Sequence, residues 1–332
     1  MTARISGLHG KGRVVGNSVS LVTGAAGFIG SHLAARLVAM GDEVHALVRP
    51  TTSLVRLAPL AGRLTIHATD FADRRVLQEC VAAIAPTRVF HLAAETRMPA
   101  TPSPAAARET LDHYIGPLLN LVEALSALPV PPTVMVRAGT IAEYGDAALP
   151  YRETGAARPT TPYGAGMLAA THYLAMLAPT LPFPAITARL ALCYGPAQSP
   201  SFFVPSVIEA ALSRRPVTMQ RPDDRRDLLH VADVVDAILR IAERAPRDCP
   251  VVNVGSGLAP AMREVADRIV ELAGCDPALV IARAAQPGDR PVELRFATEL
   301  AQTRFEWTRQ IALDDGLRQT IAAEQHLRSL AG

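Results

Sequence analysis

The stretch SVSLVTGAAGFIGSHLAARLVAMG, residues 18–41, decides the fold. An apolar run stops at Thr23, and an apolar helical pattern resumes after three spaced glycines. Gly24 can adopt torsions closed to other residues, Gly27 lets the main chain approach a pyrophosphate, and Gly30 lets a helix lie close to the strand. The stretch therefore predicts a strand, a turn and a helix whose free N–H groups face phosphates, with an unliganded glycine turn as the alternative. The cofactor contacts expected here are Gly24, Ala26, Gly27, Phe28, Ile29 and Gly30.

Composition limits the partners of the chain. The 332 residues are 49% hydrophobic, and 33 basic against 31 acidic residues give a net charge of +2, with no basic block that favours nucleic acid or a membrane. No C-x-x-C pair occurs, so neither a metal site nor a disulfide framework is expected, and a reducing cytoplasm fits. Residues 1–17 lack the apolar segment of a signal peptide and are expected to form a loose extension.

Alternating strands and helices predict an α/β fold. After the first βα unit we expect further strands at 44–48, 64–68, 88–93 and 133–137, and a long helix over 105–128 interrupted around Gly116. This order predicts a Rossmann-type, doubly wound parallel sheet in a dinucleotide-binding domain over 18–190.

The remaining residues, 191–332, are expected to form mainly a smaller α/β lobe for the substrate, with the chain crossing between the lobes. Helices are expected near 231–244, 262–273 and 313–327, and strands at 251–254 and 279–282.

The end of the second strand indicates the cofactor. Val48 stands where an Asp or Glu would accept a bond from the ribose 2′-hydroxyl of NAD, and Arg49 follows it. A cation there favours a 2′-phosphate, so NADP(H) is expected over NAD(H), with a solvated arginine as the alternative. Asp70, just past the third strand, is placed to meet the adenine.

Further motifs, taken in order, resemble the extended short-chain dehydrogenase/reductase family of nucleotide-sugar epimerases, dehydratases and ketoreductases. After TGAAGFIG come HLAAETR (91–97), AGTIAEYG (138–145), TPYGAGMLAATHYL (from Thr161), ARLALCYGP (188–196), RRDLLHVADVVDAI (225–238) and VVNVGSG (251–257). The resemblance covers nearly the whole chain. It implies additional cofactor contacts at Leu92, Ala93 and Ala94.

The resemblance also implies a catalytic set. Tyr163 matches the family's general acid/base, which also touches the cofactor, and Thr140 matches the residue that hydrogen-bonds the reacting oxygen. Met167, one helical turn after Tyr163, occupies the position of the family's lysine, which lowers the pKa of the tyrosine and holds the nicotinamide ribose.

The missing ammonium favours reduction over oxidation. A free phenol has a pKa near ~10, and oxidising an alcohol needs the scarce phenolate, whereas reducing a ketone needs a neutral phenol that donates its proton. The pKa of Tyr163 is therefore expected near that of a free phenol, and Met167→Lys is expected to lower it.

This sequence also departs from the family's pattern at positions that would act on the substrate. The family's dehydratases carry Asp-Glu directly after the active-site Thr, where this chain has Ile141 and Ala142, so dehydration is not expected. Glu143 is a candidate substrate contact, although a solvated or capping glutamate explains it better. Arg97 is a candidate replacement cation or a structural ion-pair residue.

The smaller lobe is expected to carry residues that bind a nucleotide sugar. Arg226 matches the family arginine that binds the diphosphate, Arg225 assists it, and Asp289 matches the contact to the nucleoside. A short helix over 202–212, which contains the candidate substrate contact Phe203, is expected to lie over the sugar. The position of the family's second diphosphate-binding arginine is Gln286 here, and that of its frequent asparagine is Leu192. The set of residues that binds the nucleotide sugar therefore differs from the family's.

These observations together predict an NADPH-dependent 4-ketoreductase of a nucleotide-linked, dTDP-type 4-keto-6-deoxyhexose. The alternatives are a nucleotide-sugar 4-epimerase on tightly bound NAD, and a non-catalytic dinucleotide-binding protein, which Met167, Gln286 and Leu192 motivate. A homodimer is expected through the helices beginning near Ala105 and Tyr163. The apolar positions offered for it are Leu118, Leu121, Val122, Leu168 and Leu174.

Overall fold

The computed structural model describes residues 18–95, 101–283 and 290–331. The expected extension at 1–17, and Arg97, Gln286 and Asp289, lie outside the described residues. Seven parallel strands form the central sheet in the order β11-β6-β5-β4-β1-β2-β3. They are β1 (Val19–Thr23), β2 (Glu43–Val48), β3 (Thr65–Ala68), β4 (Arg88–His91), β5 (Val134–Thr140), β6 (Ala185–Leu190) and β11 (Val251–Val254).

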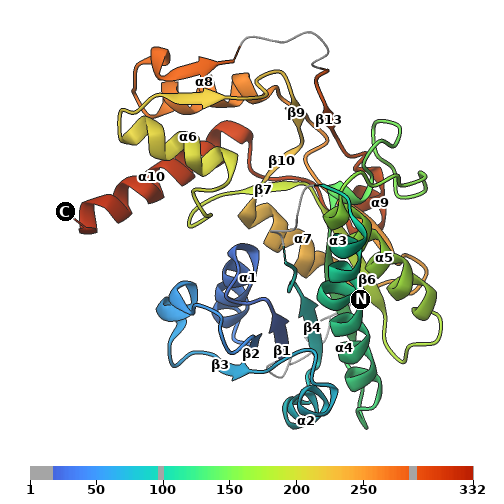
Figure 1. Cartoon of the computed structure of the whole chain (residues 1–332). Helices are drawn as coiled ribbons and strands as arrows, with labels where there is room; N and C mark the ends of the chain where they lie inside the picture. The colour runs from blue at the N-terminus through green and yellow to red at the C-terminus, as the bar shows by residue number, and fades with distance from the viewer. Residues whose placement is uncertain (1–17, 96–100, 284–289, 332) are drawn as a thin grey trace, which may run out of the picture.

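Helices cover both faces of this sheet (Figure 1). Strand residues alternate between the faces: Val22 and Val136 join the core with α1 (Phe28–Ala39) and α7 (Val231–Arg244). Leu21 and Met135 join the opposite core, with α2 (Arg74–Ile84), α4 (Gly116–Ser126) and α5 (Pro162–Leu177). The predicted doubly wound, Rossmann-type fold is confirmed.

The long helix expected over 105–128 is interrupted, as the sequence predicted. It consists of α3 (Pro104–Thr110), one π-helical turn, η2 (Leu111–Ile115), and α4. Pro117 has no N–H for the helical ladder, so the hydrogen-bond register changes before it.

Two elements assigned to the smaller lobe belong to the large sheet instead. The strand at 251–254, β11, pairs in parallel with β6, and Val252 and Val254 are fully buried in the same core as α1. The helix at 231–244, α7, packs against β5, β6 and α1. Their hydrophobic pattern fits either lobe, and only the long-range pairing with β6 fixes their place.

The smaller lobe lies beyond the carboxyl ends of the strands, in the upper part of Figure 1. Its core joins α6 (Phe203–Leu212), α8 (Met262–Leu272) and α10 (Leu313–Ala331) through Ile208, Ile269 and Leu317. Three short parallel pairs complete it. These are β7 (Leu192–Tyr194) with β10 (Leu228–His230), β8 (Val217–Met219) with β12 (Val280–Ala282), and β9 (Arg225–Arg226) with β13 (Glu293–Leu294). The remaining elements are η1 (Val55–Leu60), η3 (Ile141–Glu143), η4 (Pro277–Leu279) and α9 (Glu299–Phe305).

The turn after β1 has the geometry expected of its glycines. Gly24 adopts φ +70°, and a Cβ there would lie 2.7 Å from the backbone of Leu92 and Ala93. A Cβ on Gly30 would lie 2.1 Å from the Gly24 carbonyl oxygen. Only hydrogen atoms fit at these positions, which brings α1 directly onto the turn.

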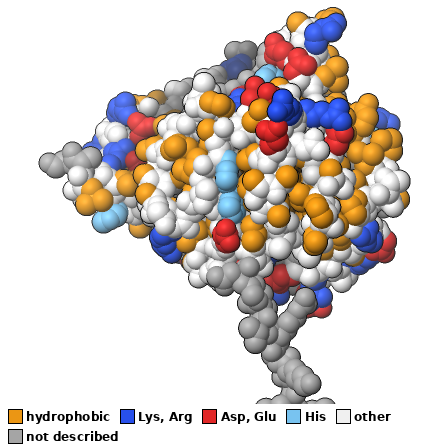
Figure 2. Space-filling view, turned by 90° about the horizontal axis from the view of Figure 1, so that it is seen from below, with side chains coloured by type: hydrophobic (Ala, Val, Ile, Leu, Met, Phe, Trp, Pro, Cys, Tyr) orange, Lys and Arg blue, Asp and Glu red, His pale blue; other side chains and the backbone are white. Residues whose placement is uncertain are grey.

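Charged side chains of both signs are interspersed with apolar ones on the face shown in Figure 2, in keeping with the nearly balanced composition. Within the described ranges, the helices are too short or too polar to cross a membrane.

Candidate functional site

A cavity of about 580 Å³ lies at the carboxyl ends of β1, β4, β5 and β6, below the smaller lobe. Strand ends in a parallel sheet meet at one edge, so residues distant in sequence meet there. The cavity brings together the glycine turn, both catalytic candidates, Met167 and the start of α6. The predicted site residues that line it are Gly24, Gly27, Phe28, Ile29, Gly30, Leu92, Ala94, Thr140, Tyr163, Met167 and Phe203.

The glycine end of the cavity is a backbone cradle. Gly27 is the N-cap of α1, and no side chain caps this helix end, so its first N–H groups face the cavity side. Ala26 is buried beneath the turn. The Ala93 N–H donates to the Thr23 hydroxyl at 3.2 Å, which ties the end of β4 to β1. These two alanines support the cradle without lining it.

The two residues expected at the adenosine end lie outside this cavity. Arg49 has a side chain that is 61% exposed, with Nη2 3.7 Å from a Glu95 carboxylate oxygen. Asp70 is exposed, and its carboxylate accepts a hydrogen bond from the Ala72 N–H at 2.9 Å. Both follow strand ends of the same sheet edge, β2 and β3.

Thr140 and Tyr163 form the polar centre of the cavity. Thr140 is the last residue of β5 and caps η3, where its hydroxyl oxygen accepts from the Ala142 N–H at 3.3 Å. Tyr163 is the second residue of α5, which begins after the side chain of Thr161 caps Gly164 N–H at 3.1 Å. The side chain of Thr140 acts on the phenol of Tyr163 in the direction that lowers the pKa of that phenol.

The surroundings of Tyr163 keep its phenol protonated. Burial raises the pKa of Tyr163, and the negative charge of Glu143 raises it further, while the Thr140 side chain and the positive charge of Arg137 oppose this. The ring of Tyr114 packs edge-on against it, with centroids 6.1 Å apart. At neutral pH the group is therefore a proton donor rather than a base.

Beneath Met167 lies a cation that the sequence analysis did not single out. Arg137, in β5, is 3% exposed, and its Nη2 lies 3.4 Å from the Met167 sulfur and 3.3 Å from the Met167 carbonyl oxygen. Its Nη1 donates to the Thr171 hydroxyl at 3.0 Å. The available signal was one arginine inside the otherwise apolar run VMVRAG of this strand.

Glu143 is a structural residue, and its capping interpretation is confirmed. Its side chain is fully buried, so it is neither solvated nor placed in the cavity as a substrate contact. One carboxylate oxygen accepts from the Thr140 N–H at 3.0 Å, completing a capping box. The other oxygen lies 2.6 Å from Arg189 Nε and 2.9 Å from the Thr171 hydroxyl. A Cβ on Gly139 would come within 2.6 Å of this carboxylate.

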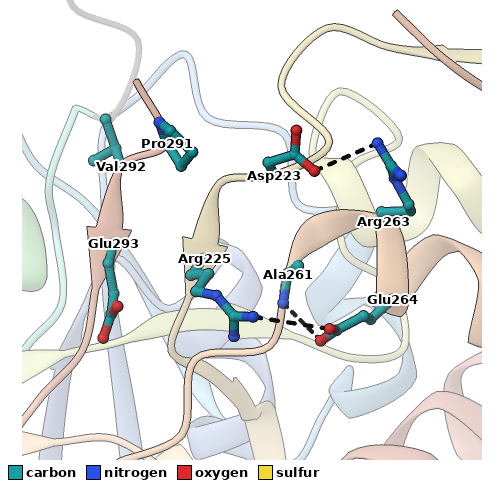
Figure 3. Close-up of a pocket in the computed structure, with 8 residues that line it drawn as sticks. All are labelled: Asp223, Arg225, Ala261, Arg263, Glu264, Pro291, Val292 and Glu293. Atoms are coloured by element: carbon teal, nitrogen blue, oxygen red, sulfur yellow. Dashed lines mark hydrogen bonds and ion pairs between the residues drawn. The ribbon is translucent and has the colours of Figure 1, made fainter. Parts of the chain in front are cut away.

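The arginines expected at the diphosphate do not line the main cavity. Arg226 Nη2 lies 2.5 Å from the buried Asp224 carboxylate, and its Nη1 donates to the Val292 carbonyl. Arg225 faces a second hollow of about 450 Å³ in the smaller lobe, opposite Glu264 (Figure 3). Both guanidinium groups thus have carboxylate partners.

The substrate end of the main cavity is mostly apolar. Among its described lining residues only Arg56 carries a formal charge, and its Nε donates to the Ala197 carbonyl at 3.2 Å. Burial raises the pKa of the Cys193 thiol to about 12, which keeps it an unreactive thiol. Arg56, Cys193 and Gln198 were not predicted as site residues, because they are brought to the cavity by η1, by β7 and by the loop after β7. The apolar lining here includes Leu192, Phe202, Phe203, Val204, Leu228 and Leu294.

Known proteins match most of the chain. The model of the NAD dependent epimerase/dehydratase family matches residues 20–255. UDP-glucose 4-epimerase of Streptomyces lividans is 27% identical, over 80% of this chain and 87% of that protein. The dTDP-6-deoxy-L-talose 4-dehydrogenase (NAD(P)(+)) of Kitasatospora kifunensis is 27% identical, over 91% and 94%. The solved structure of MoeE5 in complex with UDP-glucose and NAD has a TM-score of 0.78 and 31% identity, over 95% and 100%.

Replacing Glu143 by Gln is expected to destabilise the protein by about 3–5 kcal/mol, because it leaves Arg189 buried without its carboxylate. Urea unfolding measures the change. Glu79→Gln, which breaks an exposed ion pair between Arg75 and Glu79 one helical turn apart, is the matched control and is expected to cost less than about 0.5 kcal/mol. Equal losses in the two variants would contradict a structural role for the buried pair.

Proposed function

The chain belongs to the NAD dependent epimerase/dehydratase family, and from this premise we propose that it is an NADPH-dependent 4-ketoreductase of a nucleotide-linked 4-keto-6-deoxyhexose. The observation that most directly supports this function is the protonated phenol of Tyr163 beside the Thr140 hydroxyl, in the cavity that the glycine turn also lines. Among its relatives is the dTDP-6-deoxy-L-talose 4-dehydrogenase, which matches nearly the full chain.

The residues around the glycine turn fit a dinucleotide. The backbone around Gly24 and Gly30 leaves no room for a side chain, and the uncapped end of α1 offers N–H groups to a pyrophosphate. Leu92 and Ala94 continue this surface toward Tyr163. A bound nicotinamide would supply the hydride for the carbonyl carbon.

The chain's own residues handle the proton. In our proposal Thr140 orients the carbonyl oxygen with its hydroxyl, and Tyr163 donates its phenolic proton as negative charge develops on that oxygen. The raised pKa keeps the proton on Tyr163 until then. The same shift disfavours an alcohol oxidation, which would have to start from phenolate.

The lining of the substrate end is suited to a deoxygenated sugar. Phe202, Phe203 and Val204 present apolar surface, and a 6-deoxyhexose carries a methyl group where glucose carries a hydroxymethyl group. Arg56 is available to a phosphate of the cofactor or substrate. Arg226 would have to leave Asp224 to reach the diphosphate.

A second candidate is a nucleotide-sugar 4-epimerase that works on tightly held NAD, favoured by the match to the Streptomyces lividans enzyme. Its reaction begins with oxidation and therefore needs the phenolate that burial of Tyr163 disfavours. NAD retained by the purified protein would favour this candidate over the reductase.

The purified protein is expected to oxidise NADPH in the presence of dTDP- or UDP-linked 4-keto-6-deoxyhexoses. Tyr163→Phe is expected to lower kcat roughly a hundredfold or more, because it removes a positioned acid. Tyr173→Phe, an exposed tyrosine on the same helix, is the matched control and should retain the parent rate. A parent rate in Tyr163→Phe would exclude Tyr163 as the acid. Cofactor binding without turnover of any such sugar would favour the non-catalytic alternative.

NADPH is expected to bind more tightly than NADH, because Arg49 follows the second strand where a carboxylate would repel the 2′-phosphate. Arg49→Asp is expected to reverse the order, with each preference about tenfold, or about 1.4 kcal/mol. Calorimetric titration with both cofactors measures this. Arg75→Asp, which changes an arginine whose side chain is 86% exposed on α2, is the control and should leave the order unchanged. Equal affinities in the parent would contradict the preference.

We propose a homodimer through the α3–α4 segment and α5, but its contacts differ from those expected. The named positions are buried or half-buried within the subunit, and they are Leu118, Leu121, Val122, Leu168 and Leu174. The large apolar side chains of these elements that are exposed are Leu111 in η2, and Tyr173 and Met176 in α5.

Met176→Glu is expected to convert the dimer to a monomer, because it places a charge in an apolar contact whose present side chain is 63% exposed in the single chain. Light scattering at micromolar protein measures the mass. Leu327→Glu, at an exposed leucine of α10, should leave the dimer intact. A monomeric parent would refute the proposal.

A further inference from the structure

The guanidinium of Arg137 occupies the space below Met167. Strand alternation turns Arg137 to the same face as Met135, toward α5, where it is held by the Thr171 hydroxyl and the Met167 carbonyl. Its Nη2 also touches the Met167 sulfur at 3.4 Å. Three contacts to one face of one helix fix the group one turn from Tyr163.

This guanidinium is part of a buried cluster of charged side chains. Arg189 is 4% exposed and forms the ion pair with Glu143, whose side chain is fully buried. Among the described residues, no carboxylate lies within ion-pair distance of Arg137. The charge of Arg137 is therefore not neutralised by direct contact with a carboxylate of the described residues, and little solvent screens it in the interior.

We propose that Arg137 is a positioning residue that supplies, from β5, the positive charge on the Tyr163 phenol that a lysine at position 167 would supply from α5. The proposal deepens the proposed function, because it rests on Tyr163 as the proton donor. A cation beside the phenol stabilises the phenolate left after donation, and so makes Tyr163 a stronger acid than burial alone would allow.

The other groups facing Tyr163 set the direction in which Arg137 acts. Burial destabilises the phenolate form of Tyr163, and so do the nearby Glu143 carboxylate and Cys193 thiol. All three therefore raise the pKa of Tyr163. Thr140 and Arg137 lower it. His91, which faces Arg137 from β4, has its pKa lowered to about 3 by burial and by that arginine, and it is therefore uncharged at neutral pH.

The same geometry explains why position 167 holds an uncharged side chain. A lysine there would bring its ammonium to the place where the Met167 sulfur now meets the guanidinium, and two like charges would be buried in contact. Met167→Lys alone is therefore expected to destabilise the protein rather than simply lower the pKa of Tyr163. The cation can come from β5 or from α5, but not from both.

The test is a titration of the phenol itself. Residue 163 is replaced by 3,5-difluorotyrosine, whose phenol ionises nearer neutral pH, and ¹⁹F NMR follows its ionisation in the full chain. Arg137→Gln removes the charge and keeps an N–H donor for Thr171. It is expected to raise the pKa of residue 163 by about one unit, a tenfold change in the ionisation ratio, and Arg137→Lys to restore most of it.

Arg88→Gln is the matched control, since Arg88 is a largely buried, ion-paired arginine at the other end of the adjoining strand β4, and it should leave the titration unchanged. The double variant Arg137→Met with Met167→Lys tests the proposal even if Arg137→Gln does not fold. It is expected to fold and to titrate within about half a unit of the parent.

An unchanged pKa in Arg137→Gln, or a double variant that titrates a unit or more above the parent, would overturn the role of Arg137. The titration needs neither cofactor nor sugar. A protein that reduces no keto-sugar would therefore refute the proposed function. The titration would still decide, independently, whether Arg137 acts on the phenol.

Discussion

The carboxylate of Glu143 is the constraint on which the site depends. Through one oxygen it holds the Thr140 N–H at the end of β5, and through the other it holds Arg189 of β6 and Thr171 of α5. Three elements of the sheet edge therefore share one buried anion. Buried ion pairs contribute little net stability, but removing one partner is costly, so this carboxylate fixes geometry more than it adds free energy.

That fixed geometry lets β5 serve two functions through the alternation of its side chains. Thr140 ends the strand and reaches the cavity, while Arg137, three residues earlier, points into the layer below α5. Gly139 between them has no side chain, and a Cβ there would collide with the Glu143 carboxylate. In our proposal, one strand thus presents a hydroxyl to the substrate and a cation to the phenol at different depths.

The parts of the site predicted from sequence are those encoded locally. The glycine turn needs only the spacing of Gly24, Gly27 and Gly30, and the pairing of Thr140 with Tyr163 follows from motifs whose strand and helix meet at one edge. Arg137 and Glu143 could not be placed that way, because their partners come from other elements and a charged residue in a strand gives no sign of its contacts. β11 was misplaced for the same reason, since pairing with β6 is a long-range property.

If Arg137 replaces the lysine as we propose, the two tasks that the resemblance assigns to that lysine are separated in this chain. Arg137 can act on the phenol through the buried interior, but it does not line the cavity and cannot donate a hydrogen bond to a ribose there. Met167 does line the cavity and has no N–H to offer. In our proposal, a positive charge is retained near Tyr163 while the ribose contact of the lysine is lost. We therefore expect cofactor binding in this chain to depend more heavily on the glycine cradle, and the acidity of Tyr163 to depend little on what occupies the cavity.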